Sequence, residues 1–398
     1  MNCRERTLAA LDHREPDRVP LDFGGRNTTI HLYAHEALMR HLALSGPTPR
    51  LRSYHTQVVE PDPQLLRRFE RVSAVFFPRA PTGYVFAVDP ATSTYVDEWG
   101  TRFYMPPNGY YYDIQSGPLA AARTEEDLRR YRWPDPTDPS RIAGLAEEVE
   151  AAWAAGEKVL MMCSATPGLW EHSWYMFGLE QAFLNLAGNQ GLVEAFTERL
   201  LEWQMAYWDL VLEAVGKYVD LVQIGEDLGT QQGPIMSPAS FRKIYKPRMR
   251  RLLESIRRKT AARVYLHSCG SIYRFIPDLI ECGVQVLNPV QVNAKEMDSA
   301  RLKREFGQDL TFWGGGCDPV VLGTRTPGEV VADVKRRIDD LAPGGGYVFG
   351  SVHNIQANVP PENIVAMFDA ALEFGKYPVP AGSVRPDRVA LRKAGEEA

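Results

Sequence analysis

The hydrophobic positions of this chain change from an irregular pattern to a regular alternation after about residue 140. Short runs of consecutive apolar residues, typical of strands buried on both faces, alternate there with longer segments of helical periodicity. The predicted strands of this part are 159–163, 220–224, 263–267, 284–289, 310–313 and 346–349. The predicted helices are 142–155, 178–186, 192–215, 238–258, 272–282, 298–306, 326–341 and 361–377.

The first 140 residues predict a less regular set of elements. Helical spacing is present at 4–13, 31–44 and 65–72, and the segment 19–25 predicts a short strand that runs into a glycine turn. Between residues 85 and 112, aromatic and polar residues alternate and are interrupted by Pro and Gly. This pattern predicts β-hairpins that decorate the core of the fold rather than belong to its repeat.

Short apolar strands separated by amphipathic helices indicate βαβ units and a parallel sheet. The repeats after residue 140, together with the strand near Val19, predict a single-domain (β/α)8 barrel over residues 1–378. The alternative is an open, doubly wound sheet. Against it, no glycine-rich dinucleotide or phosphate loop follows any predicted strand. The C-terminal segment 379–398, rich in Arg, Ala and Glu, predicts a flexible tail.

Composition narrows the class of function. The formal net charge of -5 and the pI of about 6.0 give no electrostatic reason to expect nucleic acid or an anionic membrane as partner. The sequence has no apolar stretch long enough for a membrane span, and its first 20 residues lack the apolar core of a secretory signal. Five thinly spread cysteines do not suggest a disulfide framework. We therefore expect a cytoplasmic protein with a small-molecule site.

Polar side chains gather where the predicted strands end. In a barrel, reactive residues project from the C-terminal ends of the strands, so side chains from different strands meet at one rim. The candidates at this rim are Glu226, Asp227, His267, Cys269, Asn288, Gln291, Cys317, Asp318, His353 and Asn354. We expect Asn288 and Gln291 to contact substrate.

A His-x-Cys pair is the most specific feature of this rim. His267 and Cys269 are two positions apart, so an extended strand end directs both side chains to one face, and Cys317 follows a later strand. One imidazole and two thiolates suit a tetrahedral zinc ion whose fourth position stays open. The alternative is a hydrogen-bonded histidine with two buried thiols that act as small apolar side chains. Cys163 also follows a strand, but a structural role is favoured there.

Two further rim positions could supply acid or base chemistry. Glu226 and Asp227 are adjacent at a strand end and point in opposite directions, so only one of them can face the site, and Asp227 is the favoured candidate. The carboxylate that faces the site could be a general base or the fourth metal ligand, and the other, Glu226, could then cap a loop. His353 lies in the last strand–helix loop, where it could be an acid, a base or an anion contact, or could merely cap backbone carbonyls.

Substrate contacts could also come from the N-terminal region. Arg26, after the Gly24-Gly25 turn, could bind an acidic group of the substrate or could simply be an exposed arginine. Tyr111, with its neighbours Tyr110 and Tyr112, could form an aromatic lid over a flat substrate or could pack ordinarily within the hairpins.

Five segments together resemble the uroporphyrinogen decarboxylase-like family, in particular its branch of corrinoid-linked methyltransferases. They are RERTLAALDHREPDRVPLDFGG, GEDLGTQQGPIMSP, LHSCGSIYRFIPDLIECGVQVLNPVQ, FWGGGCDP and GGYVFGSVHNIQANVPPENI. The resemblance extends from Arg4 to about Pro378 and implies a (β/α)8 barrel with its cleft at the C-terminal rim. It also implies a zinc ion bound by His267, Cys269 and Cys317, with a fourth ligand that no motif identifies.

The sequence departs from the decarboxylases that give the family its name. Those enzymes carry an arginine-rich motif after the first strand, where this chain reads LDFGGRNTTIH with Arg26 alone. The resemblance therefore favours methyl transfer between a corrinoid and either a small methyl donor or a thiol acceptor. The chain has no Asp-x-His-x-x-Gly corrinoid-binding segment, so the corrinoid would arrive on a partner protein. The alternatives are a metal-free decarboxylase and a non-catalytic binding barrel, and a homodimer is plausible for the family.

Overall fold

A seven-stranded parallel sheet forms the centre of the structure, a computed structural model that describes residues 1–379. The order of its strands is β13-β12-β11-β10-β9-β8-β4. Their bounds are β4 (Ser73–Phe76), β8 (Val159–Cys163), β9 (Leu221–Gly225), β10 (Arg263–His267), β11 (Val286–Asn288), β12 (Thr311–Trp313) and β13 (Tyr347–Val348). The tail predicted to be flexible falls, from residue 380 onward, outside the described residues.

The segment after α1 (Cys3–Leu11) closes this sheet into a barrel. Leu21 forms a parallel bridge with Phe349, directly after β13. On the other side, the backbone N–H of Phe23 donates to the carbonyl of Glu70 at 3.0 Å, just before β4. The edge strands β13 and β4 are thus joined through one short segment. The predicted (β/α)8 barrel is confirmed, although the predicted strand 19–25 forms isolated bridges rather than a regular strand.

The continuous apolar run of β8 is explained by burial on both faces. Val159, Met161 and Cys163 point into the barrel and belong to its interior cluster, whereas Leu160 and Met162 pack outward in the cluster beneath the helices. The same period of two directs Tyr265 and His267 of β10 inward. Ala10 and Leu11 of α1 join the interior cluster and close the opposite end of the barrel.

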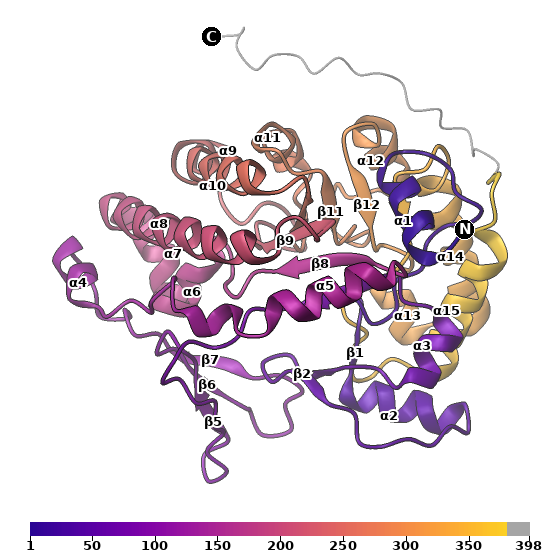
Figure 1. The fold of residues 1–398 in the computed structure, drawn as a ribbon, viewed down its shortest axis with the longest axis horizontal. Coiled ribbons are helices and arrows are strands. Elements are labelled where there is room, and N and C mark those ends of the chain that lie inside the picture. Colours follow the sequence, from indigo (N-terminus) through magenta and orange to yellow (C-terminus); the bar gives the residue numbers. More distant parts are fainter. Residues whose placement is uncertain (380–398) are drawn as a thin grey trace, which may run out of the picture.

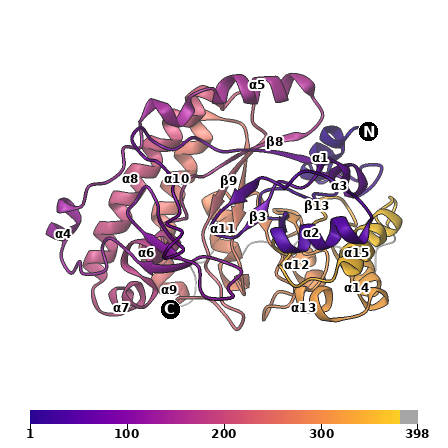
Figure 2. The same cartoon turned by 90° about the horizontal axis from the view of Figure 1, so that it is seen from below.

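Helices surround the barrel, with α5 and α8 on one side and α14 and α15 on another (Figures 1 and 2). The first helices are α2 (Leu32–His41), α3 (Pro63–Phe69), α4 (Glu125–Arg130), α5 (Leu145–Ala155), α6 (Glu171–Phe177), α7 (Leu179–Gly188) and α8 (Gln190–Val215). The later helices are α9 (Pro238–Ser240), α10 (Lys246–Lys259), α11 (Ile276–Cys282), α12 (Ser299–Phe306), α13 (Pro319–Thr324), α14 (Pro327–Leu341) and α15 (Pro361–Phe374). A π-helical turn over 241–245 joins α9 to α10.

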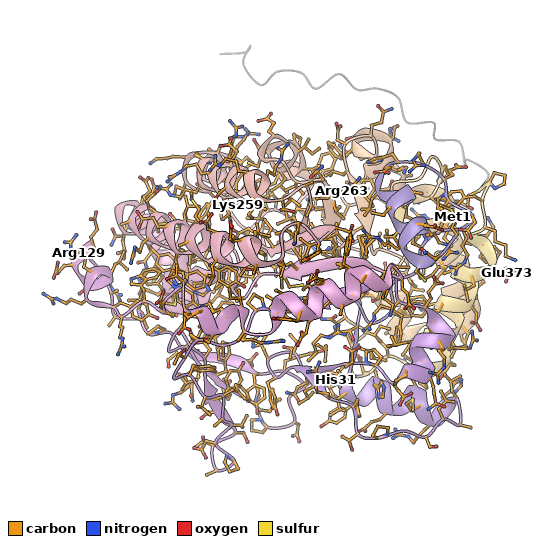
Figure 3. All side chains as sticks on the ribbon, viewed as in Figure 1. Met1, His31, Arg129, Lys259, Arg263 and Glu373 are labelled. Carbon is orange, nitrogen blue, oxygen red and sulfur yellow. The ribbon has the colours of Figure 1, made fainter. Side chains whose placement is uncertain are left out.

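Charged side chains cover the outer faces of these helices, as Arg129 on α4 and Lys259 on α10 illustrate (Figure 3). None of the helices within residues 1–379 combines the length and the apolar character needed to cross a membrane.

Two small antiparallel sheets lie beside the barrel, below it in the view of Figure 1. One has the order β1-β3-β2, and the other has the order β5-β6-β7. Their strands are β1 (Ile30–His31), β2 (Leu51–Ser53), β3 (Val58–Val59), β5 (Thr94–Val96), β6 (Arg102–Tyr104) and β7 (Asp113–Ser116). The predicted hairpin decoration is confirmed by the second sheet, and both sheets contribute side chains to the cavity described below.

Candidate functional site

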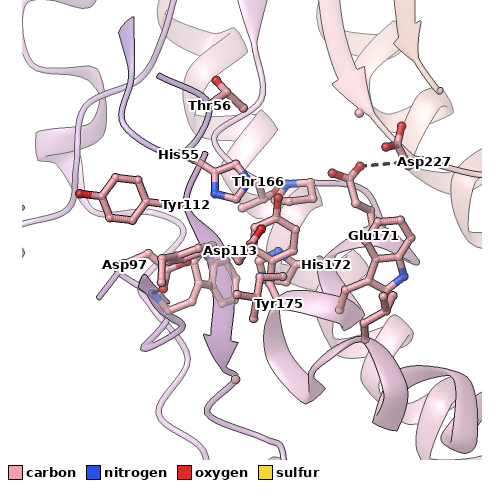
Figure 4. Close-up of a pocket in the computed structure, with 18 of the residues that line it drawn as sticks. His55, Thr56, Asp97, Tyr112, Asp113, Thr166, Glu171, His172, Tyr175 and Asp227 are labelled. Carbon is pink, nitrogen blue, oxygen red and sulfur yellow. Dashed lines mark hydrogen bonds between the residues drawn. The ribbon is translucent and has the colours of Figure 1, made fainter. Parts of the chain in front are cut away.

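A cavity of about 1190 Å³ opens where the strands β8, β9 and β10 end, and the two antiparallel sheets form its outer wall (Figure 4). Gln223, Asp227 and His267 line it from the barrel, and Tyr112 and Asp113 line it from the hairpins. Its volume exceeds that of the usual pocket for a small ligand. The cavity therefore lies at the rim at which the sequence predicts the chemistry.

Three potential metal-binding side chains converge at the barrel end of this cavity. One ligand atom each of His267, Cys269 and His353 lies within 4.8 Å of the others. Nε2 of His267 is 3.4 Å from Sγ of Cys269, and the ring centroid of His267 is 5.2 Å from that of His353. His267 and Cys269 are neighbours because His267 is the last residue of β10 and Cys269 follows two positions later. His353 reaches it from the loop after β13.

Asn288 fixes the orientation of the His267 ring. Its amide Nδ2 donates to the carbonyl of Trp313 at 2.8 Å, so its Oδ1 faces Nδ1 of His267 at 2.7 Å as an acceptor. The proton then resides on Nδ1, and the lone pair of Nε2 points toward Cys269. Burial lowers the pKa of both His267 and His353 to about 4, so both rings are neutral at pH 7, which is the form that binds metals.

Two carboxyl groups lie beside this cluster. Oδ1 of Asp227 accepts the backbone N–H of Cys269 at 2.9 Å, and the backbone N–H of Asp227 donates to Glu171 at 3.2 Å (Figure 4). Burial raises the pKa of Asp227, and burial together with the charge of Asp227 raises the pKa of Glu171 well above its ordinary value. The Cys269 thiol has a strongly raised pKa for the same reasons.

This group of acids has little positive charge to balance it. Among the residues that line the cavity, Arg26 is the one cation. A divalent cation would favour the ionised forms of the thiol and the carboxyl groups, whose pKa values burial now raises. Two neutral imidazoles and a thiol form a donor set of the kind that zinc binds, and His267 already has its second hydrogen bond in place. The residues present therefore fit a zinc ion.

Glu226 has a structural role at this site. Its Oε1 accepts the backbone N–H groups of Trp170 and Glu171, both at 2.9 Å, and so binds the start of α6. Burial raises its pKa to about 7. Asp227 faces the cavity and Glu226 does not line it, as expected for adjacent residues at a strand end. Glu226 holds Glu171 in position instead of meeting substrate.

The structure divides the predicted substrate contacts into two groups. Arg26 and Tyr111 line the cavity. Asn288 is completely buried behind His267, and Gln291 accepts the backbone N–H of Gly270 at 2.6 Å and donates to Gln231 at 3.0 Å. Neither amide lines the cavity. Asn288 and Gln291 therefore orient the ring and the loop that carry His267 and Cys269, rather than contact a substrate.

Cys317 is not part of the metal-binding group. Its Sγ lies 3.7 Å from the carbonyl oxygen of Asp318, and burial together with the neighbouring Asp333 raises the pKa of its thiol. The glycines before it explain this placement, because Gly314 and Gly315 have φ values of 95° and 73° and turn the chain sharply. The structure does not bring Cys317 together with His267 and Cys269, and it places His353 there instead.

Several cavity residues were missed by sequence reasoning. Glu171 and His172 begin α6, a helix that the periodicity did not predict, and Asp97 follows β5 in the hairpin region. The signal that was present is the segment Thr166-Pro167-Gly168, which follows β8 and leads directly to Trp170-Glu171-His172. The residues after any strand of a barrel lie near its active rim, so this segment could have been included.

Asp97 gives a pH-dependent prediction. Burial raises its pKa to about 7, above that of an unfolded aspartate, so its contribution to stability is present at low pH and is lost as the pH rises toward 7. We expect the free energy of unfolding of Asp97→Asn, relative to wild type, to increase by about 2 kcal/mol between pH 5 and pH 7.5. Urea unfolding at both pH values measures this difference. If the difference in unfolding free energy between Asp97→Asn and wild type is the same at both pH values, the prediction is wrong.

Comparison with known proteins agrees with the motifs of the sequence. Residues 109–374 match the family model for uroporphyrinogen decarboxylase (URO-D). Uroporphyrinogen decarboxylases from Geobacter metallireducens and Geobacter sulfurreducens are each 22% identical over 283 residues, which cover 67% of this chain and 75% of each relative. A solved methyltransferase from Methanosarcina mazei superimposes with a TM-score of 0.60 at 19% identity, covering 94% of this chain and 99% of that one. The chain belongs to the uroporphyrinogen decarboxylase family.

Proposed function

We propose that this chain is a zinc-dependent methyltransferase that moves a methyl group between a small substrate and a corrinoid carried by a partner protein. The observation that carries the proposal is the convergence of His267, Cys269 and His353 at the inner end of a large cavity. The proposed ligand set contains His353 in place of Cys317. The similarity in fold to the Methanosarcina mazei methyltransferase is consistent with this activity.

Each side chain of the site has a distinct role in this proposal. His267 and His353 bind as neutral imidazoles, and Asn288 holds the ring of His267 in the tautomer that leaves Nε2 free. Asp227 accepts the backbone N–H of Cys269 and so fixes the loop that presents the thiol. A zinc ion at this position would lower the pKa of a bound thiol or polarise the oxygen of a methyl ether.

Glu171 and Asp227 are suited to hold or accept a proton from the substrate. Both carboxyl groups belong to the cavity wall, and the pKa of each is raised by burial. Two neighbouring carboxyl groups repel each other when both are ionised, so one of them can hold a proton while the other accepts one. The chain has no corrinoid-binding motif of its own, so we propose that the corrinoid enters the cavity on a separate protein.

Decarboxylation is the second candidate, because the two curated relatives are uroporphyrinogen decarboxylases. The charge of the cavity opposes it. A substrate with several carboxylates requires several cations, whereas the lining contains Arg26 against the five carboxyl groups of Asp97, Asp113, Glu171, Glu180 and Asp227. Placing a polyanion here would add repulsion in a partly desolvated site.

Elemental analysis of freshly purified protein tests the proposal. We expect about one zinc ion per chain in the wild type and a loss of most of it in Cys269→Ser, because the thiolate supplies a strong zinc ligand. Cys282→Ser is the matched control, since Cys282 is a buried cysteine on α11 outside the cavity. Zinc-loaded protein is then assayed with methylated corrinoid and a thiol. Wild-type protein without zinc would refute the proposal and leave decarboxylation as the function to test.

A further inference from the structure

The outer part of the cavity, away from the metal-binding group, is walled by aromatic rings. Tyr95 and Phe103 stack at a centroid distance of 4.8 Å, and Tyr112 meets Tyr95 edge-on at 5.0 Å. Tyr175 of α6 lies 5.8 Å from Phe103 and joins this wall to the barrel end. All four rings line the cavity, and the close-up shows Tyr112, Asp97 and Tyr175 in the same region (Figure 4). Tyr95, Phe103 and Tyr112 also pack together as a small buried cluster. We call Tyr95, Phe103, Tyr112 and Tyr175 the aromatic wall.

A buried carboxyl group with one free oxygen accompanies the aromatic wall. Oδ1 of Asp97 accepts the backbone N–H groups of Trp99 and Thr101, at 3.0 and 2.8 Å. Within residues 1–379, its Oδ2 has no hydrogen-bond donor, and no Lys or Arg side chain forms an ion pair with the carboxyl group. The one cationic residue in the lining, Arg26, is held at the barrel end, where its guanidinium lies over the ring of Phe77. The aromatic wall and Asp97 are therefore an electronegative region without a described counter-ion.

A second, independent feature of this region points to a ligand. The side chain of His172 is 1% exposed and lines the cavity, and neither of its ring nitrogens has a hydrogen-bond partner among the described residues. Its ring packs edge-on against Trp99 at 4.4 Å and parallel to Tyr175 at 6.1 Å, so it cannot turn to solvent without disturbing both. An imidazole left unpaired in this way costs free energy, and a ligand with an O–H or N–H group would satisfy it.

We infer that the aromatic wall and Asp97 bind a small methylated ammonium compound in the outer part of the cavity. Aromatic faces attract a quaternary or tertiary ammonium through the ring quadrupole, and a nearby carboxylate balances its charge without a demand for several hydrogen bonds. This binding site does not require zinc.

Isothermal titration calorimetry of the purified full-length chain with choline tests this inference. The titration is made at pH 8, because burial raises the pKa of Asp97 to about 7 and its carboxyl group is ionised above that pH. The control ligand is 3,3-dimethylbutan-1-ol, which has the shape and the hydroxyl group of choline but a carbon in place of the charged nitrogen. We expect choline to bind at least about tenfold more tightly than this neutral analogue, because the ring quadrupole and the carboxylate act on the charge.

Two variants separate the contribution of charge from that of shape. Asp97→Asn keeps the oxygen that accepts the two backbone N–H groups and is expected to weaken choline binding about tenfold while leaving the neutral analogue unchanged. Tyr175→Leu removes one ring of the aromatic wall and is expected to weaken the binding of choline more than the binding of the neutral analogue. Asp209→Asn, at an exposed carboxylate on α8, is the matched control. Thermal unfolding confirms that each variant is folded.

The outcomes for this inference and for the proposed function are distinguishable. Equal affinity for choline and its neutral analogue, or no choline binding by folded wild-type protein, would overturn the inference whatever the zinc content. Selective choline binding by protein that contains no zinc would support the ammonium site and refute the zinc-dependent reaction.

Discussion

Replacing His353 by alanine is expected to remove most of the bound zinc and to lower methyl transfer at least about a hundredfold, whereas Cys317→Ala keeps both near the wild-type level. The difference follows from position. One ligand atom of His353 lies within 4.8 Å of a ligand atom of His267 and of Cys269. The thiol of Cys317 instead lies beside Asp318 and Asp333. The loss of one of three protein ligands leaves a pair that binds zinc much more weakly.

The measurement is zinc content per chain, by elemental analysis, followed by turnover at saturating metal. Added zinc should restore part of the activity of a variant whose affinity is merely reduced, so the titration separates lost affinity from a lost fold. Cys317→Ala removes a buried thiol and therefore requires an unfolding curve as its own control. Normal zinc in His353→Ala together with depleted zinc in folded Cys317→Ala would reverse the assignment and restore the ligand set that the family motif implies.

The barrel was predictable because its strands carry their signal locally. The limits of β8 and β10 match the predicted segments 159–163 and 263–267, since each is a short apolar run bounded by turn residues. The strand β4 was missed because the predicted helix 65–72 extends up to the residue before it. In the structure α3 ends at Phe69, and Glu70 adopts a φ of 66°. A change of element within four residues leaves too few positions for either period to be recognised.

The sequence predicts the site residues that lie together at the end of one strand. It does not predict those that meet only when several elements pack together. His267 and Cys269 are neighbours because a strand has a period of two, and that spacing is visible in the sequence. The proximity of His353 depends on the curvature of the sheet, which brings the loop after β13 toward the end of β10 across two intervening strands. Asp97 and His172 come from a hairpin and an unpredicted helix, whose packing against each other no local pattern specifies.

A buried aspartate reinforces the closure of the barrel, and its replacement is expected to have the largest effect on stability. Asp22 is 1% exposed, and its carboxyl group accepts hydrogen bonds from the hydroxyl groups of Ser73 at 2.7 Å and Thr28 at 3.0 Å and from Nε1 of Trp313 at 3.0 Å. These donors belong to β4, to the turn after the closing segment and to β12. One side chain thus joins three separate parts of the rim beneath the cavity. A Cβ on Gly25 would lie 2.0 Å from this carboxyl group, which is why the predicted glycine turn has no side chain there.

Asp22→Ala leaves four buried donors without their acceptor, since the backbone N–H of Ser73 also donates to this carboxyl group at 3.3 Å. We therefore expect the free energy of unfolding to fall by about 3 kcal/mol or more. Asp22→Asn is expected to lose less, because the amide oxygen can still accept two of the four bonds. Urea unfolding measures both variants, and Asp309→Ala, at an exposed aspartate, is expected to stay within about 0.5 kcal/mol of wild type. Since the Nε1 donor sits on Trp313, whose carbonyl holds Asn288 against His267, the loss of Asp22 should also loosen the zinc site. Equal stability of Asp22→Ala and Asp309→Ala would mean that the seven paired strands hold the barrel closed without this carboxyl group.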